Sequence, residues 1–79
     1  MTEDTRVEDL VYEELRRLAP RGMIITPDKL LIKDLRLIGD DAGQAAVVVQ
    51  ERLGIKVPVS EWNTVATVQD MIDLLRRYL

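Results

Sequence analysis

Hydrophobic residues recur three and four positions apart in three separate stretches of the chain, which is the spacing of a helix with one buried face. Residues that stop a helix follow two of these stretches: Pro20 and Gly22 after the first, and Gly54 after the second. Three consecutive valines in the second stretch resemble a strand, but no second strand is evident to pair with them. The pattern therefore predicts an all-α bundle of three main helices plus one short helix. The expected main helices cover residues 5–19, 40–53 and 67–78, and the short one lies between 58 and 64.

Composition restricts what such a bundle can do. The chain has 79 residues, which suits a single domain over residues 1–79. It has no cysteine and no histidine, so it lacks a thiolate and the usual acid or base at neutral pH. The 11 Lys and Arg residues are outnumbered by 14 Asp and Glu residues, which argues against binding to nucleic acid. No apolar run could span a membrane and the acidic N-terminus is unlike a signal peptide, so we expect a cytoplasmic protein. We also expect it to be monomeric and to have no enzymatic activity.

Three motifs occur in an order and at a spacing that are typical of one family. "ITPDKLLIKDL" (residues 25–35) precedes the second helix, "QERLGIKVP" (50–58) ends it, and "TVQDMIDLL" (67–75) begins the last helix. No insertion or deletion is needed to align them from Asp34 to the end of the chain. In these motifs the sequence resembles the acyl and peptidyl carrier proteins. The resemblance implies a carrier-type bundle, and it implies fatty-acid, polyketide or nonribosomal-peptide biosynthesis as the setting.

The position that defines a carrier's chemistry departs from the family. Carriers attach phosphopantetheine to a serine in a "DSL" motif, and in this register Gly39 stands at the serine position. Glycine has no side chain and cannot form the phosphodiester, and Ser60, the only serine, lies in a different loop. "DLRLIGDDA" (34–42) is instead similar to carrier-like bacterial proteins with a "GDDA" sequence. The resemblance thus implies a carrier-like protein with no phosphopantetheine cofactor, and a genuine acyl or peptidyl carrier in altered form stays the alternative.

The resemblance also implies where a partner would bind. Carriers meet their enzymes through the second helix and the loop before it, so we expect a protein partner, such as a biosynthetic enzyme, at the same place. Carriers are usually acidic along the second helix, but here its outer positions (43, 44, 47, 50 and 51) include one acidic residue, Glu51, which lies beside Arg52. Attraction to a basic partner would therefore be weak. The expected partner-binding residues are Gly39, Asp40, Asp41, Gly43, Gln44, Val47, Gln50 and Glu51.

Three further features leave alternatives open. A divalent cation would suit the carboxylates of Asp34, Asp40 and Asp41, but helix capping explains two of them and we expect no metal site. Trp62 is expected to fill the core or to cover it as a half-exposed lid, with a ligand pocket as the alternative. Small residues on the inner side of the second helix permit either close helix approach or an unfilled space. With no acyl chain to accommodate, we expect this helix to lie tight against the first and last helices. These small residues are Ala42, Ala45 and Ala46.

Overall fold

The computed structural model describes residues 3–35, 37 and 41–79, and within these ranges it is an all-α bundle, as the sequence predicted. The helices of the described residues are α1 (Glu3–Leu18), α2 (Asp41–Leu53), the 3₁₀ helix η1 (Val59–Thr64) and α3 (Val68–Arg77). Each helix begins and ends within two residues of its expected bound. In the part of the chain that the structure describes, no helix is both long enough and apolar enough to cross a membrane.

The hydrophobic stripe of α1 forms one wall of the core. Val7, Val11 and Leu15 lie four residues apart, so they share one side of the helix, and all three are fully buried. The other side of α1 carries exposed charged residues. The helix stops before Pro20, and Gly22 then takes φ +86°, a left-handed conformation that a side chain would disfavour.

Gly54 ends α2 with a Schellman motif. The glycine takes φ +70°, and its N–H donates to the Glu51 carbonyl at 3.2 Å. The N–H of Ile55 donates to the Gln50 carbonyl at 3.0 Å. These bonds satisfy carbonyls that the end of a helix would otherwise leave without partners, so the chain reverses direction at low cost.

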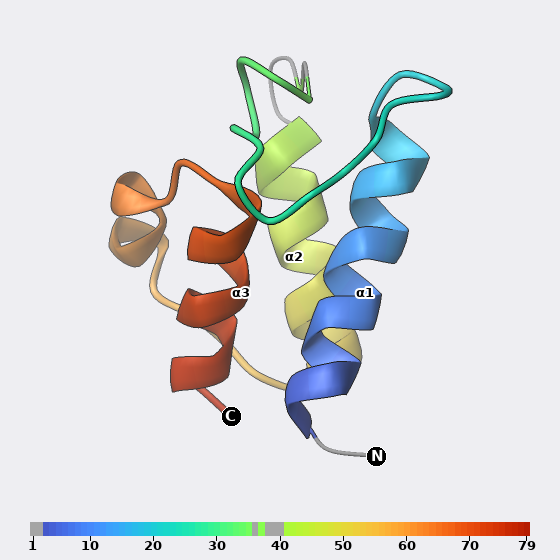
Figure 1. The fold of residues 1–79 in the computed structure, drawn as a ribbon. Coiled ribbons are helices and arrows are strands. Elements are labelled where there is room, and N and C mark those ends of the chain that lie inside the picture. The colour runs from blue at the N-terminus through green and yellow to red at the C-terminus, as the bar shows by residue number, and fades with distance from the viewer. Residues whose placement is uncertain (1–2, 36, 38–40) are drawn as a thin grey trace.

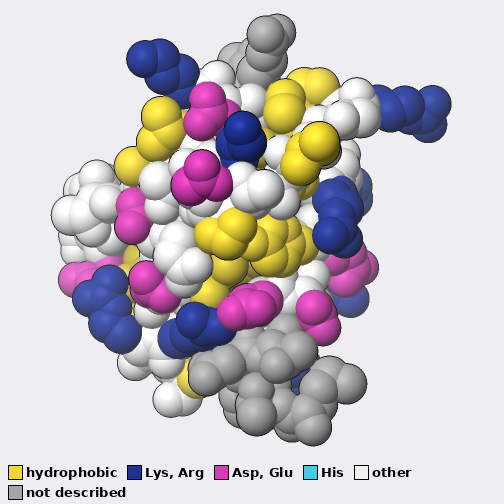
Figure 2. Space-filling model, in the orientation of Figure 1, with side chains coloured by type: hydrophobic (Ala, Val, Ile, Leu, Met, Phe, Trp, Pro, Cys, Tyr) yellow, Lys and Arg dark blue, Asp and Glu magenta, His cyan; other side chains and the backbone are white. Residues whose placement is uncertain are grey.

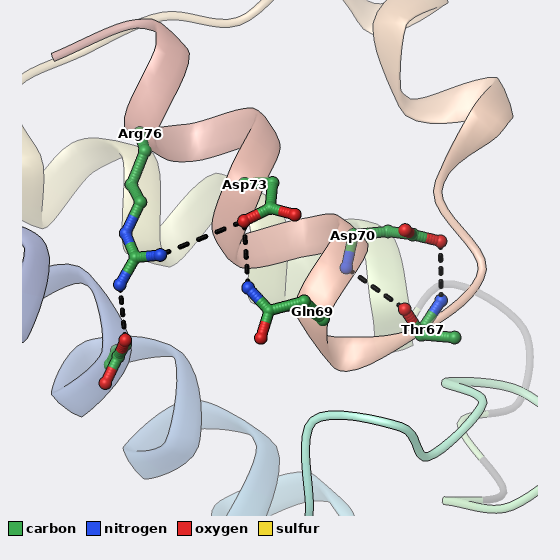
Figure 3. Close-up of polar contacts among 6 residues, drawn as sticks. Thr67, Gln69, Asp70, Asp73 and Arg76 are labelled. Atoms are coloured by element: carbon green, nitrogen blue, oxygen red, sulfur yellow. Dashed lines mark hydrogen bonds and ion pairs between the residues drawn. The ribbon is translucent and has the colours of Figure 1, made fainter.

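A capping box begins α3. The Asp70 N–H donates to the Thr67 hydroxyl at 3.0 Å, and the Asp70 carboxylate accepts from the Thr67 N–H at 3.1 Å (Figure 3). In the last turn of the helix, Arg76 contacts the Glu8 carboxylate of α1 and lies 3.8 Å from that of Asp73. The helix is therefore fixed at its start by its own cap and near its end by an ion pair with α1. Its buried residues are Val68, Met71, Ile72, Leu74 and Leu75.

The long connection between α1 and α2 lies against the residues that lead into α3. The Val68 N–H donates to the Lys29 carbonyl at 3.0 Å, and the Leu31 N–H donates to the Ala66 carbonyl at 2.9 Å. Leu31 and Leu35 are buried in the core, and Leu30 is half-buried. The connection thus closes one end of the bundle, while the start of α1 and the end of α3 lie at the opposite end (Figure 1).

α1 runs antiparallel to both α2 and α3 and packs against both, and η1 packs against α3 (Figure 1). Within the described residues, α2 makes far less backbone contact with α3 than with α1. The expected close approach of α2 is therefore right for the first helix and wrong for the last. The physical reason is an open groove along this side of α2, to which Met71 of α3 also contributes.

Candidate functional site

The groove beside α2 encloses a cavity of about 870 Å³ that is open to solvent. Its walls come from α2, from η1, from the connection at residues 30–33, and from the segments that flank η1. Of its 18 lining residues, only Lys33, Gln50, Glu51 and Lys56 have charged or amide side chains. An apolar lining with a few polar groups is typical of binding sites, whose volumes are roughly 300–1,000 Å³.

Small residues on α2 keep the groove open. Ala42, Gly43 and Ala46 line it, and a Cβ added at Gly43 would meet no atom within 4 Å. Larger aliphatic side chains at these positions would occupy the space. On the core side of the same helix, Ala45 is fully buried. The small residues of α2 thus show both alternatives at once, close packing on one side and unfilled space on the other.

Three large hydrophobic side chains lie exposed around the groove, each on a different wall. Ile32 of the connection is 71% exposed, Val47 of α2 is 52% exposed, and Val59 of η1 is 84% exposed, and all three line the groove. We call these three residues the groove rim. Isolated exposed hydrophobic residues are ordinary in proteins, but several around one apolar groove are typical of a surface that binds another molecule.

Trp62 belongs to the wall that η1 forms. Its side chain is half-buried, packs against the core and lines the groove. Backbone hydrogen bonds hold η1 in place: the Glu61 N–H donates to the Pro58 carbonyl at 3.0 Å, and the Val65 N–H donates to the Trp62 carbonyl at 3.2 Å. Trp62 is therefore half-exposed, as expected, and it also borders a pocket, as the alternative held.

Gln50 joins α2 to the segment that follows it. Its Nε2 donates to the Ala46 carbonyl at 3.0 Å, and its Oε1 accepts from the Val57 N–H at 2.6 Å. Because Val57 is buried, this hydrogen bond satisfies a backbone donor that has little access to water. Gln50, one of the expected partner-binding residues, is thus half-buried, and its side chain takes part in the internal structure.

The structure brings together part of the expected partner-binding surface. Gly43, Val47, Gln50 and Glu51 line the groove, whereas Gln44 is exposed and does not. Gly39 and Asp40 lie outside the described residues. Asp41 is the first residue of α2, but its side chain also lies outside what the structure describes.

The charged residues of the lining are Lys33, Glu51 and Lys56, and all three are exposed. Asp34, one of the three aspartates considered for a cation, accepts the Leu30 N–H through Oδ2 at 2.9 Å and so stabilises a turn. Among the residues whose placement is described, no three His, Cys, Asp or Glu residues come together as a metal site would require.

Two other carboxylates stabilise turns of the backbone. The pKa of Asp28 is lowered chiefly by the hydrogen bond from the Thr26 hydroxyl. The pKa of Asp70 is lowered chiefly by the N–H of Ala66 and then by that of Thr67. In both cases donors stabilise the charged form, which is the behaviour of a capping group.

The groove residues outside α2 could not be predicted from the sequence. Ile32, Lys33, Lys56 and Val59 lie in connecting segments or in the short η1, where no long periodic pattern indicates which way a side chain points. The sequence offers only a weak indication of the groove here: the apolar Val59 stands between Pro58 and Ser60. Only the approach of distant segments makes these residues neighbours.

A comparison with models of protein families finds no match, and a comparison with curated proteins finds none either. The described residues form a small all-α domain with an apolar groove on its surface. The described lining contains no hydroxyl, thiol or imidazole group that would serve as a nucleophile or as the usual general base. An apolar lining of this size suits the binding of another molecule.

Proposed function

We propose that this protein is a non-enzymatic interaction module, a carrier-like bundle without a prosthetic group that docks onto a partner protein through its groove. The observation that carries the proposal is the groove rim, in which Ile32, Val47 and Val59 are exposed around an apolar cavity. Covering them would remove apolar surface from water, which contributes about 25 cal/mol per Å². A monomeric state and a cytoplasmic location belong to the same proposal.

The resemblance to acyl and peptidyl carriers also supports a partner-binding surface at the groove beside α2. Carriers use the second helix to meet their enzymes, and here Gly43, Val47 and Glu51 of that helix line the groove. Gly39, at the attachment position, has no atom to which phosphopantetheine could be joined. The partner under this proposal is a biosynthetic enzyme or another protein of the same pathway.

The size of the cavity favours a second candidate, a genuine carrier that shelters an acyl chain in the groove. A cavity of about 870 Å³ with an apolar lining would accommodate such a chain. This candidate requires a covalent attachment point for phosphopantetheine, and the only serine is the exposed Ser60 on η1. It therefore makes a chemical prediction that the first candidate does not.

Mass spectrometry of the intact protein separates the two candidates. The protein is incubated with coenzyme A and a broad-specificity phosphopantetheinyl transferase, beside a true carrier as positive control. We expect no change in mass. A gain of one phosphopantetheine would overturn the first candidate and support the second, and loss of that gain in Ser60→Ala would locate the attachment.

Site-specific photo-crosslinking tests the interaction itself. A photoreactive amino acid replaces Val47 in the groove rim or, as a matched control, Ile24, which is 74% exposed but does not line the groove. In cells of the source organism we expect a discrete protein adduct from position 47 that position 24 does not form. Identical adducts from the two positions, or none from either, would overturn the proposal.

A further inference from the structure

Lysine is unevenly distributed over this protein. Only three of the 11 basic residues are lysines, namely Lys29, Lys33 and Lys56, and two of these line the groove. Both groove lysines are exposed, and Glu51 is the only acidic residue of the described lining. Among the described lining residues, two lysines thus stand beside one glutamate, in a protein whose net charge is −3.

In the part of the chain that the structure describes, three of the eight arginines are paired with acidic side chains. Each of these three forms an ion pair with a residue of α1, and on the face that Figure 2 shows, basic and acidic side chains are interspersed. By contrast, Lys33 and Lys56 form no ion pair with any residue in the described ranges. The arginine pairs are Arg17–Glu14, Arg52–Glu13 and Arg76–Glu8. The groove lysines are therefore available to an external acidic group.

The two lysines lie toward opposite ends of the groove. Lys33 belongs to the connection at the end where α2 begins, and Lys56 belongs to the segment that follows the last turn of α2 (Figure 1). α2 has 13 residues and is therefore about 20 Å long. An occupant that reaches both lysines must extend along much of α2, which is the length of a helix of about three to four turns.

We infer that the groove receives an amphipathic α-helix of the partner protein, with apolar side chains in the cavity and acidic side chains opposite Lys33 and Lys56. The inference rests on the proposed function and names the chemistry of the partner. Apolar anchors at positions i, i+3, i+4 and i+7 of a helix enter such a groove, while the flanks of the helix stay at its edges. The signs of charge are opposite to those in carriers, where an acidic second helix meets a basic partner.

Two features favour a helix over a small amphiphile. A small molecule held inside the cavity would contact the inner surfaces of the rim residues Ile32, Val47 and Val59 and would leave their outer surfaces in water. A helix lying along the groove would cover all three. It would also place charges at both lysines, whereas a single headgroup would reach one.

Two designed peptides serve as the probes. Both are amphipathic helices of about four turns with the same leucine positions and no aromatic residues, and they differ only in whether the flanking residues are Glu or Lys. Trp62 is the only tryptophan of the chain and lines the groove, so its fluorescence reports binding without a label. We expect the acidic peptide to bind about tenfold more tightly, since two close charge pairs contribute about 1.4 kcal/mol together, and added salt to reduce this preference.

Charge reversal in the protein provides the sharper test. In Lys33→Glu/Lys56→Glu the preference should invert, so that the basic peptide binds more tightly. Lys29→Glu is the matched control, because Lys29 does not line the groove and its reversal should change the preference by less than about twofold. Circular dichroism and thermal unfolding establish that each variant keeps the wild-type fold. All three positions lie outside the helices, so we expect no change.

Other occupants of the groove are outcomes of the same experiment. Equal binding of both peptides, or a preference that Lys33→Glu/Lys56→Glu does not alter, would overturn the inference. Laurate that saturates the Trp62 signal while neither peptide binds would assign the groove to a small amphiphile. A dimer in sedimentation analysis that Val47→Glu dissociates would assign it to a second copy of this chain. If the crosslink at position 47 persists while the charge preference is absent, the inference fails and the proposed function stands.

Discussion

The two sides of α2 are made of similar residues and have opposite surroundings. On the core side, Ala45 and Val49 are fully buried. On the groove side, Ala42 borders open space and Val47 is half exposed. The side chains do not differ in kind, so the difference comes from what faces them. A small residue permits close packing only where another element arrives to fill the space.

Polar contacts hold α1 against the core side of α2. The Arg6 guanidinium donates to the Arg52 carbonyl at 2.9 Å, and the Arg52 side chain lies 3.3 Å from the Glu13 carboxylate. On the groove side, Gln50 bonds only to α2 itself and, through Val57, to the segment that follows. The helix is therefore fixed from one side, and its other side borders the open groove.

The largest change in stability should distinguish the core side of α2 from its groove side. Ala45→Leu adds volume to a filled core and should lower the free energy of unfolding by about 1–3 kcal/mol. Ala42→Leu makes the same change beside the groove and should alter it by less than about 0.5 kcal/mol. Urea denaturation of both variants measures the difference. Equal costs would mean that the groove is closed in solution, and a stabilising Ala45→Leu would reveal a cavity on the core side.

A smaller loss of stability should follow from removing the hydrogen bond between Gln50 and the Val57 N–H. Gln50→Leu removes the acceptor of the buried Val57 N–H and should destabilise the protein by about 1–2 kcal/mol. Gln44 also lies on α2 but is exposed, so Gln44→Leu should change the free energy of unfolding by less than about 0.5 kcal/mol. If chemical denaturation gave both variants the same stability, Gln50 would have no structural part in the groove.

The cap of α3 should give an effect that depends on pH. The pKa of Asp70 lies below the ordinary value of 3.8, so its charged form favours the folded state. Asp70→Asn should cost about 1 kcal/mol near neutral pH. Since the folded pKa is lowered, this advantage of wild type is present above the ordinary pKa and is lost as the pH falls through the folded value. Thermal unfolding across the acidic range measures it, and a difference from Asp70→Asn that persists undiminished in strong acid would contradict the assignment.

The smallest effect should be a gain in stability. Gly43 lies in α2 with open space around its position, so Gly43→Ala should stabilise the helix by about 0.5–1 kcal/mol. Gly54→Ala is the contrasting variant, because φ +70° disfavours a side chain and the change should destabilise. Differential scanning calorimetry resolves both shifts. A destabilising Gly43→Ala would show that the groove wall is more crowded than the structure has it.

The helices and their ends could be predicted because local residues determine them. The spacing of Val7, Val11 and Leu15 identifies a buried face without reference to any other segment. Pro20 and Gly54 mark helix ends through their own backbone preferences, and all bounds fall within two residues of expectation. The resemblance to carriers also pointed to the side of α2 that carries Gly43 and Val47, which form part of the groove wall.

The tertiary structure alone decided which small residues of α2 are covered and which are open. Ala42 and Ala45 are the same residue three positions apart, and no local rule distinguishes them. The distinction arises because α1 packs along one side of α2, while η1 and the connection come near the other side without filling it. Likewise, Ile32, Val47 and Val59 become one surface only when three segments distant in sequence approach each other. Contacts between distant segments depend on how the whole chain packs, and the pattern within any one segment does not contain that information.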